Sequence, residues 1–138
     1  MRTAIDSSVL LDVFGADTRF GEASRTALRS AYDAGSIVAC EVVWAEVRAH
    51  FGSDEDFDQS MATVGVQFVA LSEAAAREAG ARWSRRRQRR RAGTAGARPV
   101  ADYLIGVHAL YHADALLTRD RGFFGRDFEG LQVIDPSR

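Results

Sequence analysis

Residues 99–126 read PVADYLIGVHALYHADALLTRDRGFFGR, and this stretch predicts a helix, then a buried strand, then a loop that carries an acid. Pro99 suits the first turn of a helix, because its missing N–H would have no partner there. The apolar residues that recur beyond it at helical spacing are Val100, Leu104, Val107 and Tyr111. Ala115–Thr118 is a short apolar run typical of a strand, and Asp120 follows it closely. Open α/β sheets place their chemistry just beyond such strand ends, so Asp120 is the first candidate site residue.

The rest of the chain alternates between short apolar stretches typical of strands and longer stretches with helical periodicity. The expected strands are Arg2–Ile5, Ser36–Cys40, Val66–Leu71, Ala115–Thr118 and Leu131–Ile134. One expected helix begins at Val9 and another at Val100. The others are expected over Glu22–Ala34, Val42–Phe51 and Ser53–Val64, and from Ser72 to about Ala92. This alternation favours a parallel sheet that helices cover on both faces. We therefore expect one α/β domain over residues 1–138, with a mostly parallel sheet of about four to five strands.

The charge of the chain is unevenly distributed. All 18 basic residues are arginines, and eight of them lie between Arg82 and Arg98, where there is no acid. The remainder of the chain has ten arginines against nineteen acids, a net charge of −9. One basic face or loop is therefore expected on an otherwise acidic protein.

The sequence carries no sign of a membrane segment. No apolar run approaches the roughly 18 residues that span a bilayer, and the N-terminus lacks the plan of a signal peptide. The single Cys40 cannot form an internal disulfide, which fits a reducing cytoplasm. We expect a cytoplasmic protein with no membrane partner.

Acids occupy comparable places after several expected strands. Asp6 and Asp120 follow strands directly, Glu46 lies about a turn and a half into a helix after the second strand, and Asp102 lies in a first helical turn. An acid in such a place, taken alone, is more often only a helix cap or a solvated turn residue. Four carboxylates at one sheet edge would repel each other unless a cation lay between them. Such oxygen ligands select Mg²⁺ or Mn²⁺, which can activate water against a phosphodiester.

Four segments resemble, in order, the signature stretches of PIN domains, and most closely those of the VapC-type toxins of bacterial toxin–antitoxin pairs. They are AIDSSVLLDVF (4–14), VVWAEV (42–47), PVADYLIGVHAL (99–110) and ALLTRDRGF (115–123). The resemblance implies a three-layer PIN-like fold and an Mg²⁺- or Mn²⁺-dependent endoribonuclease, which forms a homodimer and is held inactive by a cognate VapB-like antitoxin.

The resemblance also implies roles for individual residues. The acidic set of the family falls on Asp6, Glu46, Asp102 and Asp120, which would hold the metal and serve catalysis. Thr118 matches the hydroxyl residue that accompanies the last acid, and Ser7 or Ser8 the polar residue after the first. The sequence departs from the family at Cys40-Glu41, where a small residue and often proline is expected. Glu41 could add a fifth carboxylate or point away, and Asp12 could join the outer part of the site.

The arginine run is more basic than the family requires. Its members Arg85, Arg86, Arg89 and Arg90 could bind RNA phosphates, since arginine contacts phosphate with two nitrogens. Docking of an acidic antitoxin segment or a solvated helix end would also explain the run. Trp83 could stack on an unpaired base, but packing against the sheet is the stronger expectation.

Other functions fit the sequence less well. His108 and His112 share one helix face, but Ala109 stands where a metalloprotease motif needs glutamate. A dehalogenase-type phosphatase needs an acid where Ser8 stands, and a receiver domain needs a lysine, which the chain lacks. The remaining alternative is a non-catalytic PIN-like module that binds RNA or a partner protein.

Overall fold

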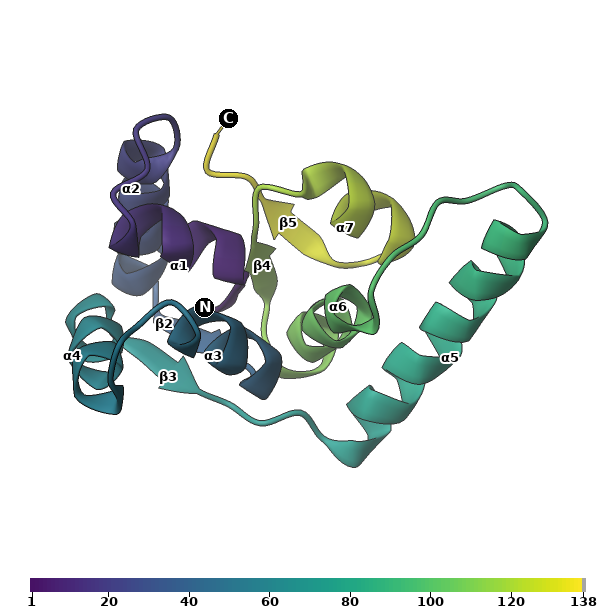
Figure 1. Ribbon diagram of the computed structural model, residues 1–138, viewed down its shortest axis with the longest axis horizontal. Coiled ribbons are helices and arrows are strands. Elements are labelled where there is room, and N and C mark those ends of the chain that lie inside the picture. The colour runs from purple at the N-terminus through teal and green to yellow at the C-terminus, as the bar shows by residue number, and fades with distance from the viewer. Residues whose placement is uncertain (138) are drawn as a thin grey trace.

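Five parallel strands form the centre of the computed structural model, which describes residues 1–137 (Figure 1). They are β1 (Arg2–Ile5), β2 (Ser36–Ala39), β3 (Val66–Phe68), β4 (Ala115–Leu117) and β5 (Gln132–Ile134). Their order across the sheet is β3-β2-β1-β4-β5, so β1 lies in the middle. This architecture confirms the predicted α/β fold. Arg138, the last residue of the predicted domain, lies outside the described residues.

The central strands β1, β2 and β4 are buried beyond their first residues, because both of their faces are covered. Ala4 of β1 pairs with Val38 of β2 on one side and with Leu116 of β4 on the other, and all three are buried. The two edge strands carry the exposed Gln67 and Gln132. The pattern of polarity along the chain thus matches the order of the strands in the sheet.

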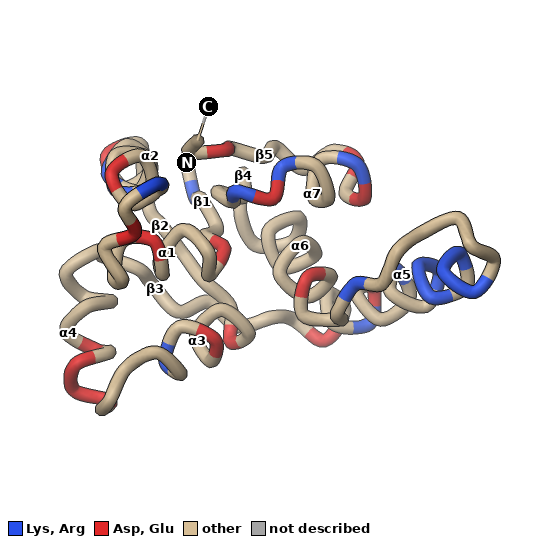
Figure 2. Tube along the Cα trace, turned by 45° about the horizontal axis from the view of Figure 1, so that its top comes forward, with Lys and Arg blue, Asp and Glu red and all other residues tan. Residues whose placement is uncertain are grey.

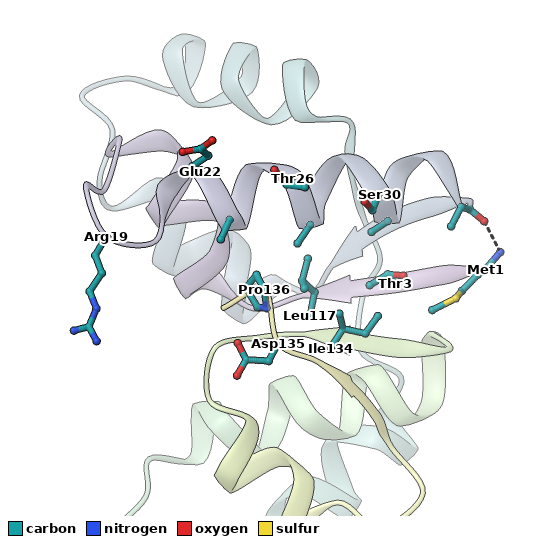
Figure 3. A pocket seen from close by; sticks show the side chains of 14 residues that line it. Met1, Thr3, Arg19, Glu22, Thr26, Ser30, Leu117, Ile134, Asp135 and Pro136 are labelled. Carbon is teal, nitrogen blue, oxygen red and sulfur yellow. Dashed lines mark hydrogen bonds between the residues drawn. The ribbon is translucent and has the colours of Figure 1, made fainter. Parts of the chain in front are cut away.

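Helices cover both faces of the sheet. They are α1 (Ser7–Phe14), α2 (Gly21–Asp33), α3 (Glu41–Arg48), α4 (Asp54–Val64), α5 (Glu73–Arg91), α6 (Val100–His112) and α7 (Arg121–Asp127). Helix α6 packs on β1 and β4, and α5 lies along α6 at the outside of the molecule (Figure 1). Helix α2 lies over the opposite face, where it borders a groove of about 830 Å³ with Thr3, Leu117 and Ile134 (Figure 3).

Three elements differ most from the prediction. Helix α3 ends at Arg48 rather than Phe51. Strand β3 ends at Phe68 rather than Leu71: the Val69 N–H still donates to the Ala39 carbonyl of β2 at 3.0 Å, but the backbone groups that follow have partners outside the sheet. The Val69 carbonyl lies 2.8 Å from Nε2 of His108, and the Leu71 N–H donates to Glu41 Oε1 at 2.8 Å. The segment after Asp120 forms helix α7 instead of a loop.

Helix α7 is held by the packing of its aromatic residues. Phe123 and Phe124 are buried, and the ring of Phe123 meets that of Tyr103 on α6 edge-on at 5.4 Å. Phe128 packs directly over Gly106 of α6, where any side chain would collide with its ring. This aromatic cluster fixes the position of α7 beside the carboxyl end of β4.

Candidate functional site

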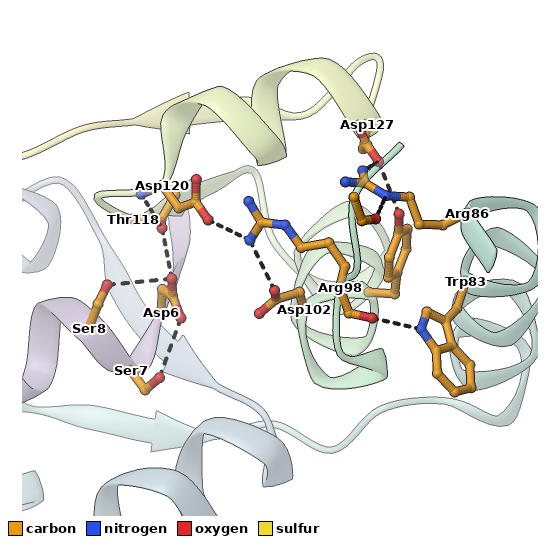
Figure 4. Close-up of polar contacts among 12 residues, drawn as sticks. Asp6, Ser7, Ser8, Trp83, Arg86, Arg98, Asp102, Thr118, Asp120 and Asp127 are labelled. Carbon is orange, nitrogen blue, oxygen red and sulfur yellow. Dashed lines mark hydrogen bonds and ion pairs between the residues drawn. The ribbon is translucent and has the colours of Figure 1, made fainter. Parts of the chain in front are cut away.

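Asp6 lies at the carboxyl end of β1, where the chain turns into α1. Its backbone N–H donates to the carbonyl of Leu117 at 3.0 Å, which joins the ends of β1 and β4. Its side-chain oxygen Oδ2 accepts a hydrogen bond from the Thr118 hydroxyl at 2.7 Å and lies 3.4 Å from that of Ser8 (Figure 4). The Ser7 hydroxyl lies 3.4 Å from Asp6 Oδ1 and donates to Glu46 Oε1 at 3.0 Å, so it links two of the predicted acids.

The electrostatics of Asp6 reflect a crowded acidic site. Removal from water raises the pKa of Asp6, and the charges of Asp102 and Glu46 raise it further. The hydrogen bond from Thr118 acts in the opposite direction. A raised carboxylate pKa caused by burial and like charges is typical of functional sites.

Asp102 and Asp120 share one guanidinium. Arg98 Nη1 donates to Oδ2 of Asp102 at 3.1 Å and to Oδ2 of Asp120 at 2.8 Å (Figure 4). The guanidinium carbon lies 4.0 Å from the centroid of the Phe123 ring. Partial burial disfavours the charge on Arg98, but the hydrogen bonds that it donates to Asp120 and Asp102, with the charges of these acids, outweigh it and raise the pKa of the guanidinium.

Thr118 connects the two halves of this site. Its side chain is fully buried; the hydroxyl donates to Asp6 and accepts from the backbone N–H of Asp120 at 3.0 Å. Its own backbone N–H donates to the carbonyl of Ile134 on β5. One residue after β4 thus sets the positions of the acids that follow β1 and β4.

The structure brings Asp6, Glu46, Asp102 and Asp120 to the carboxyl edge of the sheet. Their oxygens are the ligands that Mg²⁺ and Mn²⁺ prefer, so the chemistry of the donor set fits such an ion. Within residues 1–137, however, no three acidic, histidine or cysteine side chains are grouped closely enough to hold an ion as they stand. Asp102 and Asp120 are instead placed to suit the guanidinium of Arg98.

Sequence reasoning missed Arg98 as a member of the site. The available signal was its position four residues before Asp102, just ahead of the helix that begins at Val100. The contact with Asp120 depends on the tertiary fold. Trp83 of α5 also fixes this residue, because its indole N–H donates to the Arg98 carbonyl at 2.9 Å. Trp83 is partly buried against the core as a packing residue, but α5 packs mainly on α6 and not on the sheet, so the expected contact with the sheet is wrong.

The arginine run forms the second half of α5 (Figure 2). Arg85 and Arg90 are exposed, as an RNA-contacting surface requires. Arg86 is instead turned inward: it is paired with Asp127 at 3.1 Å and donates to the Gly96 carbonyl at 2.8 Å. Arg89 is half-exposed and lies 3.6 Å from the same carboxylate of Asp127. The run therefore has an inner, structural side and an outer side.

Other candidate residues lie away from the acidic edge or have structural partners. The Glu41 carboxylate accepts from the Leu71 backbone, and Asp12 accepts from Ser24 and Arg119 inside the protein. His112 accepts from the Ser72 backbone N–H at 3.1 Å.

None of the described helices is long and apolar enough to cross a membrane.

Comparisons with known proteins identify the fold. The sequence profile of the PIN domain matches residues 3–129. A chain of FitAB bound to the IR36 DNA fragment has a TM-score of 0.72 at 18% identity, covering 99% of this chain and 96% of its own. A chain of VapBC2 from Rickettsia felis, bound to a promoter DNA fragment, has a TM-score of 0.67 at 14% identity, covering 98% of each chain.

A third structure shares the fold. A toxin–antitoxin complex from Klebsiella pneumoniae contains a chain with a TM-score of 0.63 at 20% identity, covering 97% of each chain. The comparison with curated protein sequences finds no match.

Proposed function

The chain belongs to the PIN domain family, and on that premise we propose that it is a metal-dependent endoribonuclease, the toxin of a toxin–antitoxin pair. The observation that carries the proposal is the meeting of Asp6, Glu46, Asp102 and Asp120 at one sheet edge, where the charges of Glu46 and Asp102 act on Asp6. Acids brought this close without a catalytic purpose would only cost stability.

Each side chain would have a distinct part in the reaction. Asp6, Asp102 and Asp120, with Glu46, would hold Mg²⁺ or Mn²⁺, which would supply an activated water for attack at the phosphodiester. Thr118 orients Asp6 through its hydroxyl, and Ser7 ties Glu46 to the same group. These hydroxyls position the acids and give them a fixed geometry in which to receive an ion.

RNA would reach the site along the outer side of α5. Arg85 and Arg90 are exposed there, and their attraction for phosphate would offset the repulsion between RNA and the acidic edge. Changing both to glutamine is expected to weaken RNA binding and flatten its dependence on salt. If the affinity for RNA depended on salt as strongly as in the original chain, α5 would not belong to the RNA interface. Arg86 is not part of this test, because its loss would also loosen α5.

The expected partners follow from the fold. Chains of the same fold occur in toxin–antitoxin complexes, which supports a cognate VapB-like antitoxin. We further propose a homodimer in the cytoplasm, with residues 1–138 acting as one domain.

The decisive experiment is cleavage of total RNA by purified protein with Mn²⁺ or Mg²⁺. Cleavage that EDTA stops and that Asp6→Asn abolishes is the expected result. The matched control is Asp58→Asn, the same change at an exposed position on α4, which should cleave normally. Equal cleavage by Asp6→Asn would refute the proposed site. A lack of cleavage by all three proteins would favour the non-catalytic binding module.

A further inference from the structure

We infer that Arg98 is a built-in cation of the acidic site, which occupies Asp102 and Asp120 until a divalent ion displaces it. The inference rests on the proposed function, because it concerns the same acids. Beyond the proposed function, the guanidinium of Arg98 would compete with the metal, and this competition would set the metal concentration at which the site fills.

The first support is that one nitrogen serves both acids. Nη1 of Arg98 donates to Asp102 at 3.1 Å and to Asp120 at 2.8 Å, in each case to the oxygen Oδ2. A guanidinium nitrogen of this kind carries two hydrogens, so each acid receives one of them. The arginine therefore links the two carboxylates as a bridging cation would.

The second support is that Arg98 is held in this position at both ends. The Trp83 indole of α5 donates to its backbone carbonyl, and the Phe123 ring of α7 lies against its guanidinium. The Arg98 side chain is 26% exposed, whereas that of Arg77 on α5 is 79% exposed. Arg98 is thus a fixed part of the site rather than a mobile surface side chain.

The third support is that the two cations exclude each other. A magnesium-sized ion binds carboxylate oxygens at about 2.0–2.1 Å, and the guanidinium already uses one oxygen of each acid. An ion bridging Asp102 and Asp120 would stand in contact with a like charge. Arg98 therefore releases at least one acid when the ion binds. The apparent affinity for metal is the intrinsic affinity multiplied by the fraction of protein in which Arg98 has already done so.

The test is a titration of the metal-free protein with Mn²⁺ by calorimetry. Arg98→Gln is expected to bind Mn²⁺ about tenfold more tightly than the original chain, as a site occupied by Arg98 about nine-tenths of the time would require. Arg98→Lys, which keeps the charge but loses the forked geometry, should fall between the two. The matched control is Arg126→Gln, which removes the same charge from an exposed position on α7 and should change the affinity little.

Two further variants separate this inference from the proposed function. Asp6→Asn and Asp120→Asn should each weaken Mn²⁺ binding if the acids form the metal site. With that weakening seen, equal affinity in Arg98→Gln and the original chain would overturn the role of Arg98 alone. Equal tightening in Arg98→Gln and Arg126→Gln would also overturn it, since general charge would then explain the effect. Unchanged binding in both aspartate variants would refute the metal site, and the inference with it.

A melting experiment gives a second readout. Without metal, Arg98→Gln should melt at a lower temperature, because Asp102 and Asp120 lose their shared counter-ion. Saturating Mn²⁺ should raise its melting temperature more than that of the original chain. An equal rise in the two proteins would contradict the competition. Arg98→Lys serves the same comparison if the glutamine variant fails to fold.

Discussion

Replacing Asp127 with alanine is expected to destabilise the protein by about 3 kcal/mol, since a largely buried arginine, Arg86, then loses its ion-pair partner. Asp127 and Arg86 are only 15% and 16% exposed, and their atoms Oδ2 and Nη1 lie 3.1 Å apart. The same carboxylate accepts from the Tyr103 hydroxyl at 3.0 Å and lies 3.6 Å from Arg89. Loss of a buried ion-pair partner costs about 3–5 kcal/mol, and the residual exposure places this pair at the lower end.

The assay is reversible unfolding in urea or by heat, followed by circular dichroism. For a chain of this size, each kcal/mol lowers the melting temperature by about 4 °C, so the variant should melt about 12 °C lower. The matched control is Arg77→Ala, which breaks an exposed pair with Glu73 on the same helix. Its effect should stay within about 0.5 kcal/mol.

A double-mutant cycle completes the test. Combining Asp127→Ala with Arg86→Gln should cost clearly less than the two single changes added together, because each single variant already breaks the same pair. A loss of stability of less than about 1 kcal/mol in Asp127→Ala, or full additivity of the two changes, would refute a stabilising role for the Arg86–Asp127 pair between α5 and α7. Arg86 would then return to the candidates for RNA binding.

Three further predictions concern single positions. Asp6→Asn should stabilise the metal-free protein by about 1 kcal/mol at neutral pH. Because the pKa of Asp6 is raised on folding, the difference in stability between the variant and the original chain should grow as the pH rises through the folded-state pKa. It should vanish below about pH 4, as thermal melts would show. Gly106→Ala should destabilise by about 2 kcal/mol through its collision with Phe128, whereas Gly80→Ala, with open space around it, should stabilise by up to about 1 kcal/mol in the same urea titrations. Burial lowers the pKa of His108, so stability should fall as the pH drops below about 6.5, and urea titrations of His108→Gln should show a smaller fall.

The sheet could be predicted from sequence because its information is local. The apolar runs of β1, β2 and β4 show directly which strands are covered on both faces, and the acids after β1 and β4 mark one edge. Strand β3 was predicted too long because its last three residues are as apolar as its first three. The side chains that contact the backbone of these residues, Glu41 and His108, lie on helices distant in the sequence.

Helix α7 and the position of Arg98 could not be read from the sequence. The stretch Arg121–Asp127 has two glycines and no side-chain cap, so local preference disfavours the helix that aromatic packing stabilises. Arg98 belongs to a basic run, and its composition alone indicates a solvated charge. Its contact with Asp120 joins residues 22 positions apart, and no pattern of spacing reports such a pair. The inward turn of Arg86 escaped prediction for the same reason.

The central place of β1 has a consequence for how the protein is made. Strand β1 is synthesised shortly before β2, its neighbour on one side, but long before β4, its neighbour on the other. The bond from Thr118 to Asp6 spans 112 positions of sequence. A nascent chain that stops before β4 therefore leaves one side of β1 unpaired and holds only part of the acidic edge. Asp6 can meet Thr118 and Asp120 only after most of the chain has been synthesised.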